Sequence, residues 1–346
     1  MTDDKQVVVE RRGSGGFIVL DRPQALNALT LRMVREIAAA LDDFERDAGV
    51  ERVVVSGAGE RAFSAGGDVR WLYERGSAGD YAAQSAFFRE EYTLNARIKR
   101  YRKPYVSLID GLAMGGGVGV SLHGAHRVAT ERAELAMPEV AIGFFPDVGA
   151  TFALPRLPHR LGVAMAVTGL RARCADMAAF GLATAHVADA RLPALARALE
   201  RPGDTGALIN EFASPAPASP LMAHVQTIET AFAQADAARI AAALKADGSD
   251  FAGRLIDMMA SKSPTSLAIA LRQMQIGASM SFEEAMRVEF RIVTHICRGH
   301  DFYEGVRATL VDKDNRPQWR PPAGERPSPE DIDAYFAPLG ADELAL

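Results

Sequence analysis

The sequence predicts an α/β fold, and three observations lead to this fold class. Short apolar runs of strand length alternate with longer runs that place apolar residues on one helical face. Glycine-rich turns directly follow two of the strand-like runs. The 346 residues are 48% hydrophobic and 24% charged, which is typical of a globular protein with a large core. Such alternation favours an α/β architecture.

The first part of the chain contains the first strand and helix of this pattern. Residues 17–20 predict a strand. Thr30 is placed to cap a helix that ends near Phe44, because residues 33, 34, 37 and 41 are apolar and share one face. A second strand is expected at 53–55.

The following segment repeats this order. The loop at 63–68 comes after the second strand, a long polar helix is expected over 80–100, and residues 105–109 predict a third strand. A glycine-rich segment then leads into another helix, and no internal sequence repeat is visible.

The composition changes near residue 190, where alanine-rich helical segments begin. ASPAPASP at 213–220 predicts a loop or short linker. A helical pattern runs from residue 251 to about residue 300, and the proline-rich tail at 317–329 is expected to be extended. We therefore divide the chain into a core at 1–200, a helical or linker insertion at 201–250, and a C-terminal helical region with an extended tail at 251–346.

Charge and cysteine content argue against several functions. The net charge of −5 disfavours nucleic acid as the main partner. Cys174 and Cys297 are too few for a disulfide framework, and no Cys/His set has metal-site spacing. The acidic first residues, MTDDKQ, differ from a signal or transit peptide, and no apolar run reaches membrane-spanning length. We expect a cytoplasmic protein without a membrane partner.

The segment IDGLAMGGGVGVSLHG at 109–124 is unusual, since glycine inside a helix costs roughly 1 kcal/mol relative to alanine. Its glycines lack the G-x-G-x-x-G spacing of a dinucleotide site and the downstream Lys-Ser/Thr of a P-loop. Backbone N–H groups without side chains can instead approach a carbonyl oxygen and stabilise negative charge on it. One N–H is seldom enough, and SAGGD at 64–68 is the candidate for the second donor.

Three segments together resemble the crotonase superfamily of enoyl-CoA hydratases and isomerases. They are AFSAGGDV at 62–69, GLAMGGGVGV at 111–120 and MPEVAIGFFPDVGA at 137–150. The resemblance covers nearly the whole chain and implies a spiral of ββα turns with a trailing helical region. It also implies an acyl-CoA thioester as substrate, no cofactor apart from the CoA of that substrate, and an oxyanion hole made by the N–H groups of Gly67 and Gly116.

The residue at position 119 helps to decide which branch of the superfamily the chain resembles. Enoyl-CoA hydratases normally carry a glutamate three residues after the middle glycine, where this chain has Gly119. Their second glutamate corresponds to Glu139. A hydratase that lacks one of its two acid–base carboxylates would be a poor catalyst, so Gly119 argues against hydratase activity.

Several further segments resemble 3-hydroxyisobutyryl-CoA hydrolases, the thioesterases of valine breakdown. These segments are FFREEYTLN at 87–95, KPYVSLIDGLAMGGGVGVSLHG at 103–124, FPDVGATFALPRL at 145–157, SPTSL at 263–267 and CRGHDFYEGVRATLVDKDNRPQW at 297–319. The last of them lies outside the catalytic core, so it separates this branch from generic hydratases. The resemblance implies a hydrolase site that uses Glu91, Gly116, Glu139 and Asp147.

Thioester hydrolysis needs a polarised carbonyl and an activated water or nucleophile. Glu139 and Asp147 flank a turn rich in Gly, Phe and Pro, whose apolar residues are expected to raise one carboxyl pKa. Glu139 either activates water or attacks the carbonyl to form a mixed anhydride. Asp147 either holds the substrate hydroxyl or shuttles a proton, and Glu91 completes the polar wall.

Each carboxylate also has an ordinary structural explanation: a helix start for Glu139, a turn for Asp147 and a solvated helix face for Glu91. The presence of two glycine loops favours the catalytic roles of Glu139 and Asp147. His123 and His126 share a helix face but have no third ligand nearby, so no metal site is expected. None of the seven histidines stands in a nucleophile-activating motif.

The resemblance places CoA against the loop RPQALN at 22–27. Arg22 would line the CoA channel, and the backbone of Ala65 and Asp68 would receive the adenine. Gln24 stands where a lysine is common in the family.

An enoyl-CoA hydratase or isomerase that uses Glu139 alone and a non-catalytic acyl-CoA-binding protein remain alternatives. A homo-oligomer is also compatible with the resemblance, since trimers are common in the fold.

Overall fold

The computed structural model describes residues 5–346 and contains two compact units whose segments are interleaved along the chain. The first unit comprises the residues up to Gly67, Thr93–Ala136 and Ala172–Pro220. The second unit comprises Asp68–Tyr92, Met137–Arg171 and Leu221–Leu346. The consecutive segments expected from composition differ from these units, because composition does not record which distant segments pack together.

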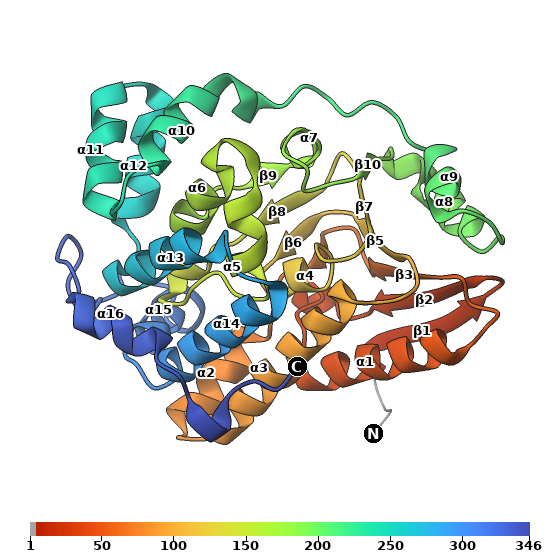
Figure 1. Ribbon diagram of the computed structural model, residues 1–346, viewed down its shortest axis with the longest axis horizontal. Helices are drawn as coiled ribbons and strands as arrows, with labels where there is room; N and C mark the ends of the chain where they lie inside the picture. Colours follow the sequence, from red (N-terminus) through yellow and green to blue (C-terminus); the bar gives the residue numbers. More distant parts are fainter. Residues whose placement is uncertain (1–4) are drawn as a thin grey trace. The chain divides into compact units, whose positions relative to one another are not determined.

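The first unit holds both β-sheets found within residues 5–346. The larger sheet has the strand order β1 (Val7–Arg12), β2 (Gly15–Leu20), β3 (Arg52–Gly57), β5 (Tyr105–Ile109), β7 (His126–Ala129) and β10 (Ala185–His186). The smaller sheet has the order β4 (Ala62–Ser64), β6 (Leu112–Met114), β8 (Glu134–Ala136) and β9 (Ala172–Arg173). β1 and β2 are antiparallel, and Figure 1 shows them beside β3. The strands expected at 17–20, 53–55 and 105–109 are confirmed.

Successive pairs of strands generate a spiral. β3 and β4, β5 and β6, and β7 and β8 each send their first strand to the larger sheet and their second to the smaller sheet. Strands from successive turns are parallel neighbours in both sheets. Val53, Val54 and Val55 of β3 are all buried, as expected for a parallel strand covered on both faces. This arrangement confirms the predicted spiral of ββα turns.

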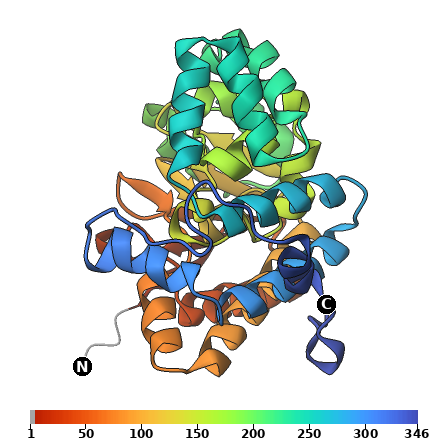
Figure 2. The same cartoon turned by 90° about the vertical axis from the view of Figure 1, so that its left-hand side faces the viewer.

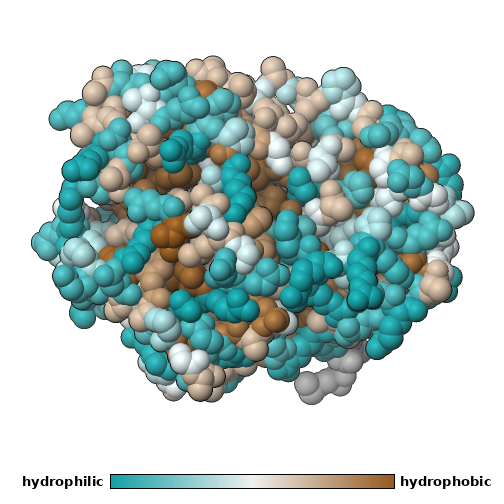
Figure 3. Space-filling model, viewed as in Figure 1, coloured by the Kyte–Doolittle hydropathy of each residue, from teal (hydrophilic) through white to brown (hydrophobic). Residues whose placement is uncertain are grey.

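Helix α1 (Leu31–Arg46) packs against β1 and β2. The Thr30 hydroxyl accepts a hydrogen bond from the Met33 N–H at 3.2 Å, so the predicted N-cap is confirmed. Met33, Ile37 and Leu41 are buried, whereas the surface over α1 is hydrophilic in Figure 3. The helix therefore covers the sheet with the apolar face that the sequence predicted.

The helix expected after the glycine-rich segment is present but short. β6 comes first, and α4 (Gly116–Gly119) is only four residues long. A Cβ added at Gly117 would lie 2.3 Å from the carbonyl oxygen of Ser64, so only glycine allows α4 this close to the end of β4. The remaining helices of the first unit are α7 (Cys174–Ala179), α8 (Leu192–Ala198) and α9 (Thr205–Asn210).

The second unit is built from helices. They are α2 (Val69–Ser77), the N-terminal part of α3 (Tyr81–Lys99), α5 (Ala150–Ala153), α6 (Leu161–Thr168), α10 (Val225–Phe232), α11 (Ala237–Asp247), α12 (Asp250–Ala260), α13 (Pro264–Gly277), α14 (Phe282–Ile296), α15 (Asp301–Val306) and α16 (Pro329–Phe336). α11 packs against both α10 and α12, and these are the teal helices of Figure 2. The predicted helix at 80–100 and the helical pattern from 251 to 300 are confirmed.

The tail differs from its predicted extended form. Residues 317–328 contain no helix, but α16 begins at Pro329. Proline is compatible with the first position of a helix because the N–H that it lacks would be unsatisfied there. The Ser328 hydroxyl caps the helix by accepting from the Asp331 N–H at 3.0 Å. The proline that suggested an extended chain is therefore a helix-starting residue.

The close approach of α4 to β4 predicts that Gly117→Ala lowers the free energy of unfolding by about 1–3 kcal/mol, because the new Cβ forces a backbone shift. Gly253→Ala in α12 is the matched control. No atom lies within 4 Å of a Cβ at Gly253, so alanine there should stabilise by up to about 1 kcal/mol. Urea denaturation measures both values, and equal stabilities would contradict the packing argument.

Candidate active site

The two glycine loops lie together in the first unit because β4 and β6 are parallel neighbours. Ser64 ends β4 and Met114 ends β6, so both loops leave the smaller sheet at the same edge. A Cβ added at Gly66 would lie 3.0 Å from the carbonyl oxygen of Met114 and 3.3 Å from the Gly116 nitrogen. These distances show that the two loops touch.

The loops offer the backbone donors that an oxyanion hole requires. Within residues 5–346, neither the Gly67 N–H nor the Gly116 N–H donates to another group. Each follows a glycine with positive φ, Gly66 at 104° and Gly115 at 47°, a conformation that L-residues rarely adopt. Gly119 is buried in α4. The α4 turn therefore supplies backbone donors but no acid–base side chain.

Four of the carboxyl side chains buried in the second unit form a group that we call the carboxylate cluster: Glu91, Glu139, Asp147 and Glu289. None of them is more than 7% exposed. They come from α3, the 3-10 turn Glu139–Ile142, the loop after it and α14. Electrostatic repulsion couples Asp147 to each of the other three. Asp147 is therefore the central member of the cluster, and the predicted residues Glu91 and Glu139 belong to it.

Hydrogen bonds hold two members of the cluster. The Tyr92 hydroxyl donates to Oδ2 of Asp147 at 2.8 Å. The Glu289 carboxyl accepts from the N–H of Gly149 at 2.7 Å and from the N–H of Thr151 at 2.8 Å. Because Gly149 and Thr151 come shortly after Asp147, Glu289 fixes the loop that carries Asp147.

The other two members keep an unused oxygen. Oε1 of Glu91 and Oε2 of Glu139 are buried and have no hydrogen-bond partner in the structure. A buried carboxyl oxygen without a partner is unfavourable for folding. Such groups persist where a reaction needs them, so these two oxygens are candidates for contact with a substrate or a reacting water.

Burial raises the pKa of all four carboxyl groups, because loss of hydration penalises the charged form. The pKa of Asp147 reaches about 7, with the Tyr92 hydrogen bond opposing the effect of burial. Burial, followed by the charge of Asp147, raises the pKa of Glu289 to about 8 despite the bonds from Gly149 and Thr151. Burial and then Asp147 hold the pKa values of Glu91 and Glu139 well above their usual range. Asp147 and Glu289 therefore change protonation near neutral pH.

Aromatic rings keep water away from the turn between Glu139 and Asp147. The ring centroid of Phe144 lies 5.7 Å from that of Phe88, 4.8 Å from that of Phe145 and 5.4 Å from that of Phe302. All four rings are buried. They supply the low-dielectric surroundings that the sequence predicted from the apolar residues of this turn.

The backbone after Asp147 is strained. Val148 has a φ of 52°, which is unfavourable for a β-branched residue, and Gly149 follows with a φ of 92°. Such strain persists only when the surroundings impose it. Glu289 supplies this constraint through its bonds to the N–H groups of Gly149 and Thr151.

Sequence reasoning missed three residues of this site: Tyr92, Gln273 and Glu289. The Gln273 side-chain amide donates to the carbonyl of Pro146 at 2.9 Å and to the hydroxyl of Thr151 at 2.7 Å. A signal was present in α14, where Glu289 shares a buried face with Ala285, Ile292 and Val293. A charged residue within an apolar helical stripe indicates a buried acid.

The residues predicted to receive CoA take part in local hydrogen bonds. The Arg22 guanidinium donates to the carbonyl of Ala28 at 2.7 Å. The Ala65 N–H donates to the carbonyl of Leu26 at 2.9 Å, which leaves its carbonyl as the group available to an adenine. Asp68 caps α2 by accepting from the Trp71 N–H at 3.2 Å. Their roles in CoA binding stay predictions.

No group of three or more His, Cys, Asp or Glu side chains suited to a metal ion occurs within residues 5–346. The helix face expected to carry both His123 and His126 is not present, because His123 lies in the turn after α4 and His126 begins β7. In the same residues, no helix combines the length and the apolar character that crossing a membrane requires.

Comparisons with known proteins extend these observations. A sequence model described as enoyl-CoA hydratase/isomerase matches residues 15–336. The chain is 42% identical to the mitochondrial 3-hydroxyisobutyryl-CoA hydrolase of Gallus gallus, over 98% of this chain and 91% of the relative. It is 43% identical to the protein of the same name from Danio rerio, over 99% and 92%. This agrees with the predicted resemblance to the hydrolase branch.

Solved structures share the fold over the full length. A carnitinyl-CoA dehydratase from Mycobacterium thermoresistibile is 40% identical with a TM-score of 0.94, covering 99% of both chains. An enoyl-CoA hydratase from Rhodobacter sphaeroides is 40% identical with a TM-score of 0.93, covering 99% of this chain and all of the other. The region matched by the family model contains both glycine loops and the carboxylate cluster. The chain therefore belongs to the enoyl-CoA hydratase/isomerase family.

Proposed function

We propose that this protein is a 3-hydroxyisobutyryl-CoA hydrolase, which splits its thioester into free CoA and a hydroxy acid in valine breakdown. The observation that carries the proposal is the carboxylate cluster around Asp147, in a chain that has glycine at position 119. The similarity to 3-hydroxyisobutyryl-CoA hydrolases over nearly the whole chain supports the choice of substrate.

We assign the Gly67 and Gly116 N–H groups to the thioester carbonyl oxygen. Attack on the carbonyl carbon moves an electron pair onto this oxygen, and fixed backbone donors stabilise the negative charge as it forms. Neither N–H is engaged with another group within residues 5–346, so both are free for this role. The positive φ angles of Gly66 and Gly115 orient the two donors without a side chain in the way.

Glu139 is assigned to the step that attacks the carbonyl carbon. In one route its carboxylate takes a proton from water, the water oxygen bonds to the carbonyl carbon, and the C–S bond breaks to release the CoA thiolate. In the other, the carboxylate itself bonds to the carbonyl carbon, the C–S bond breaks, and water then hydrolyses the mixed anhydride. Both routes need ionised Glu139, and its unpartnered oxygen Oε2 is the atom available for either.

Asp147 is assigned to proton movement or to the substrate hydroxyl. With a pKa of about 7, it can release or take up a proton near neutral pH, as the departing CoA thiolate and the hydroxy acid require. The Tyr92 hydroxyl donates to only one of the two carboxyl oxygens of Asp147, Oδ2. Glu91, also buried with an unpaired oxygen, is assigned to the polar wall of the acyl site.

An enoyl-CoA hydratase or dehydratase is the second candidate, because two solved relatives bear such names. Gly119 counts against it, since it leaves the hydratase position in α4 without a carboxylate. A non-catalytic acyl-CoA-binding protein is a weaker alternative, because binding alone does not require four buried carboxyl groups.

A cytoplasmic location and a homo-oligomer remain part of the proposal, although vertebrate relatives are named mitochondrial. Cell fractionation and light scattering test these two points.

Hydration of an enoyl thioester needs one group to activate water and another to deliver the α-proton. Glycine at 119 provides neither, so the purified protein should release CoA from 3-hydroxyisobutyryl-CoA far faster than it hydrates crotonyl-CoA. Thiol titration and the loss of enoyl absorbance measure the two rates on one preparation. Efficient hydration without thiol release would favour the second candidate.

Glu139→Gln and Asp147→Asn should each lower the turnover number by about 10²–10⁴, because they remove an ionisable group but keep the shape of the side chain. The affinity for CoA should remain nearly unchanged, so the loss lies in the chemical step. Stopped-flow thiol release and calorimetric titration with CoA separate the two quantities. A variant that loses CoA affinity but keeps its turnover number would remove that residue from the catalytic assignment.

The raised pKa of Glu289 predicts a pH-dependent stability. The folded protein retains a proton on Glu289 up to about pH 8, whereas the unfolded chain releases it near pH 4. The contribution of this group to the free energy of unfolding is therefore present at low pH and is lost as the pH rises toward 8. Glutamine cannot ionise, so Glu289→Gln does not lose this contribution. The free energy of unfolding of the variant should therefore rise relative to that of the wild type as the pH increases from 5 to 9.

Denaturant titrations across that pH range measure the effect. Glu283→Gln on the same helix is the control, since Glu283 does not belong to the carboxylate cluster. Parallel pH profiles for Glu289→Gln and the wild type would show that Glu289 ionises normally in the folded protein.

A further inference from the structure

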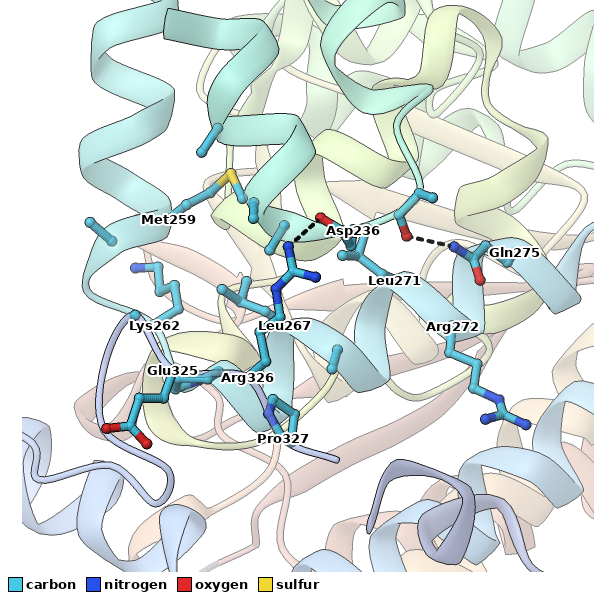
Figure 4. A pocket seen from close by; sticks show the side chains of 18 of the residues that line it. Asp236, Met259, Lys262, Leu267, Leu271, Arg272, Gln275, Glu325, Arg326 and Pro327 are labelled. Atoms are coloured by element: carbon cyan, nitrogen blue, oxygen red, sulfur yellow. Dashed lines mark hydrogen bonds and ion pairs between the residues drawn. The ribbon is translucent and has the colours of Figure 1, made fainter. Parts of the chain in front are cut away.

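The C-terminal part of the second unit encloses two cavities, neither of which is lined by the carboxylate cluster. Figure 4 shows the first, with a volume of about 560 Å³ and a largely apolar lining from α11, α12, α13 and residues 324–327. Arg326 extends into this region and pairs with Asp236 at 3.2 Å. Arg326 and Pro327 also line the second cavity, which differs in being polar.

The polar cavity has a volume of about 580 Å³. The start of α13, the end of α14 with the turn after it, residues 320–321 and 326–328, and α16 supply its lining. Most of its lining residues carry a charged or hydrogen-bonding side chain, in contrast to the alanine-rich lining of its neighbour. A space of this size admits a small molecule, not only a single ion.

Two guanidinium groups of the polar cavity lack an anionic partner. No carboxylate within residues 5–346 forms an ion pair with Arg298 or Arg320. Arg326, the third arginine of the lining, is already paired with Asp236. Asp331 is the one carboxylate among the lining residues, so the free positive charges outnumber it.

Neutral donors accompany the two arginines. Nε2 of His295 is buried without a hydrogen-bond partner, and burial followed by the charge of Arg298 lowers the pKa of this imidazole. The Tyr335 ring packs edge-on against the His295 ring with centroids 6.2 Å apart. Ser328, whose hydroxyl caps the N-terminus of α16, also lines the cavity.

The cavity is held in place before any ligand arrives. The Arg320 N–H donates to Oδ1 of Asp301 at 2.9 Å, and the Arg320 carbonyl accepts from the Thr265 hydroxyl at 3.3 Å. Arg272 of α13 forms an ion pair with Asp333 of α16. The tail segment that carries Arg320 and the helix that carries Tyr335 are thus both bonded to the helices around the cavity.

We propose that this polar cavity binds the phosphate group of a small phosphorylated molecule, with Arg298 and Arg320 as its main ligands. Each guanidinium offers a planar fork of donors, and a phosphate has enough oxygens to accept from both forks and from His295 at once. A monocarboxylate has only two oxygens and would leave donors unused. The room beyond the phosphate accommodates the organic part of a monoester. The inference does not depend on the hydrolase assignment.

Calorimetric titration of the full-length protein with inorganic phosphate, pyrophosphate and glycerol 3-phosphate tests the proposal. The titrations are done at constant ionic strength with CoA present at a saturating concentration, so that the substrate site is filled. We expect binding of at least one probe, weakened about tenfold or more by the double substitution Arg298→Gln and Arg320→Gln. Stronger binding of glycerol 3-phosphate than of inorganic phosphate would identify a monoester as the ligand, and the reverse order free phosphate.

Arg287→Gln is the matched control, since it removes a guanidinium from the same helix as His295 but does not line the cavity. Its affinity for the probes should equal that of the wild type. Equal weakening in the control and in the double variant would show general electrostatic attraction and overturn the proposal. Absence of binding for all three probes would overturn it as well.

A measurement on the unaltered protein keeps the test independent of how the double variant folds. Phenylglyoxal modifies free guanidinium groups, and mass spectrometry locates each modified arginine. Pyrophosphate or glycerol 3-phosphate should protect Arg298 and Arg320 in the presence of CoA and should leave Arg287 reactive. Equal modification of Arg298 and Arg320 with and without the probes would contradict a phosphate site at this cavity.

Discussion

The hydrogen bonds from the N–H groups of Gly149 and Thr151 to Glu289 join two segments of the second unit that are far apart in sequence. They hold the loop in which Val148 adopts a left-handed conformation, and this loop carries Asp147. Without the bonds, the strained backbone would relax and the Asp147 carboxyl would lose its fixed direction. Burial of Glu289 and the position of Asp147 are therefore two results of the same interaction.

This interaction also explains why an unfavourable group of acids is retained. Four carboxyl groups buried together repel one another when ionised, so the folded protein keeps protons that the unfolded chain would release. At neutral and alkaline pH, the burial of these carboxyl groups therefore lowers the free energy of unfolding. What the protein gains is two carboxyl groups that change protonation near neutral pH, Asp147 with a pKa of about 7 and Glu289 with a pKa of about 8.

Much of the fold could be predicted because the signals are local. The strands at 17–20 and 105–109, the Thr30 cap and the long helix at 80–100 each follow from periodicity within one segment. Strand β1 was missed because three valines are followed by charged residues, a pattern of an edge strand with an exposed face. Helix α16 was missed because proline indicates a chain break unless the capping residue before it is considered.

The site could be predicted only in part, because some of its contacts join segments that lie far apart in the sequence. Glu139 and Asp147 lie in one contiguous motif, so a short segment identifies both. Glu289 and Gln273 belong to helices far along the chain, and only packing shows that they meet the loop around Pro146 and Thr151. The interleaving of the two units could not be predicted either, since it depends on contacts between segments that are distant in the sequence.

Backbone and side chains contribute differently to function in this family. The donors of Gly67 and Gly116 depend on the parallel pairing of β4 with β6 and on the glycines that let the two loops touch, so they belong to the fold itself. Side chains decide what happens after the carbonyl is polarised. A carboxylate at position 119 would suit the addition of water to an enoyl group, whereas in the mechanism proposed above glycine there leaves attack on the carbonyl carbon to Glu139. On this proposal, one substitution on a four-residue helix selects between two reactions without altering the strand pairing that brings the two glycine loops together.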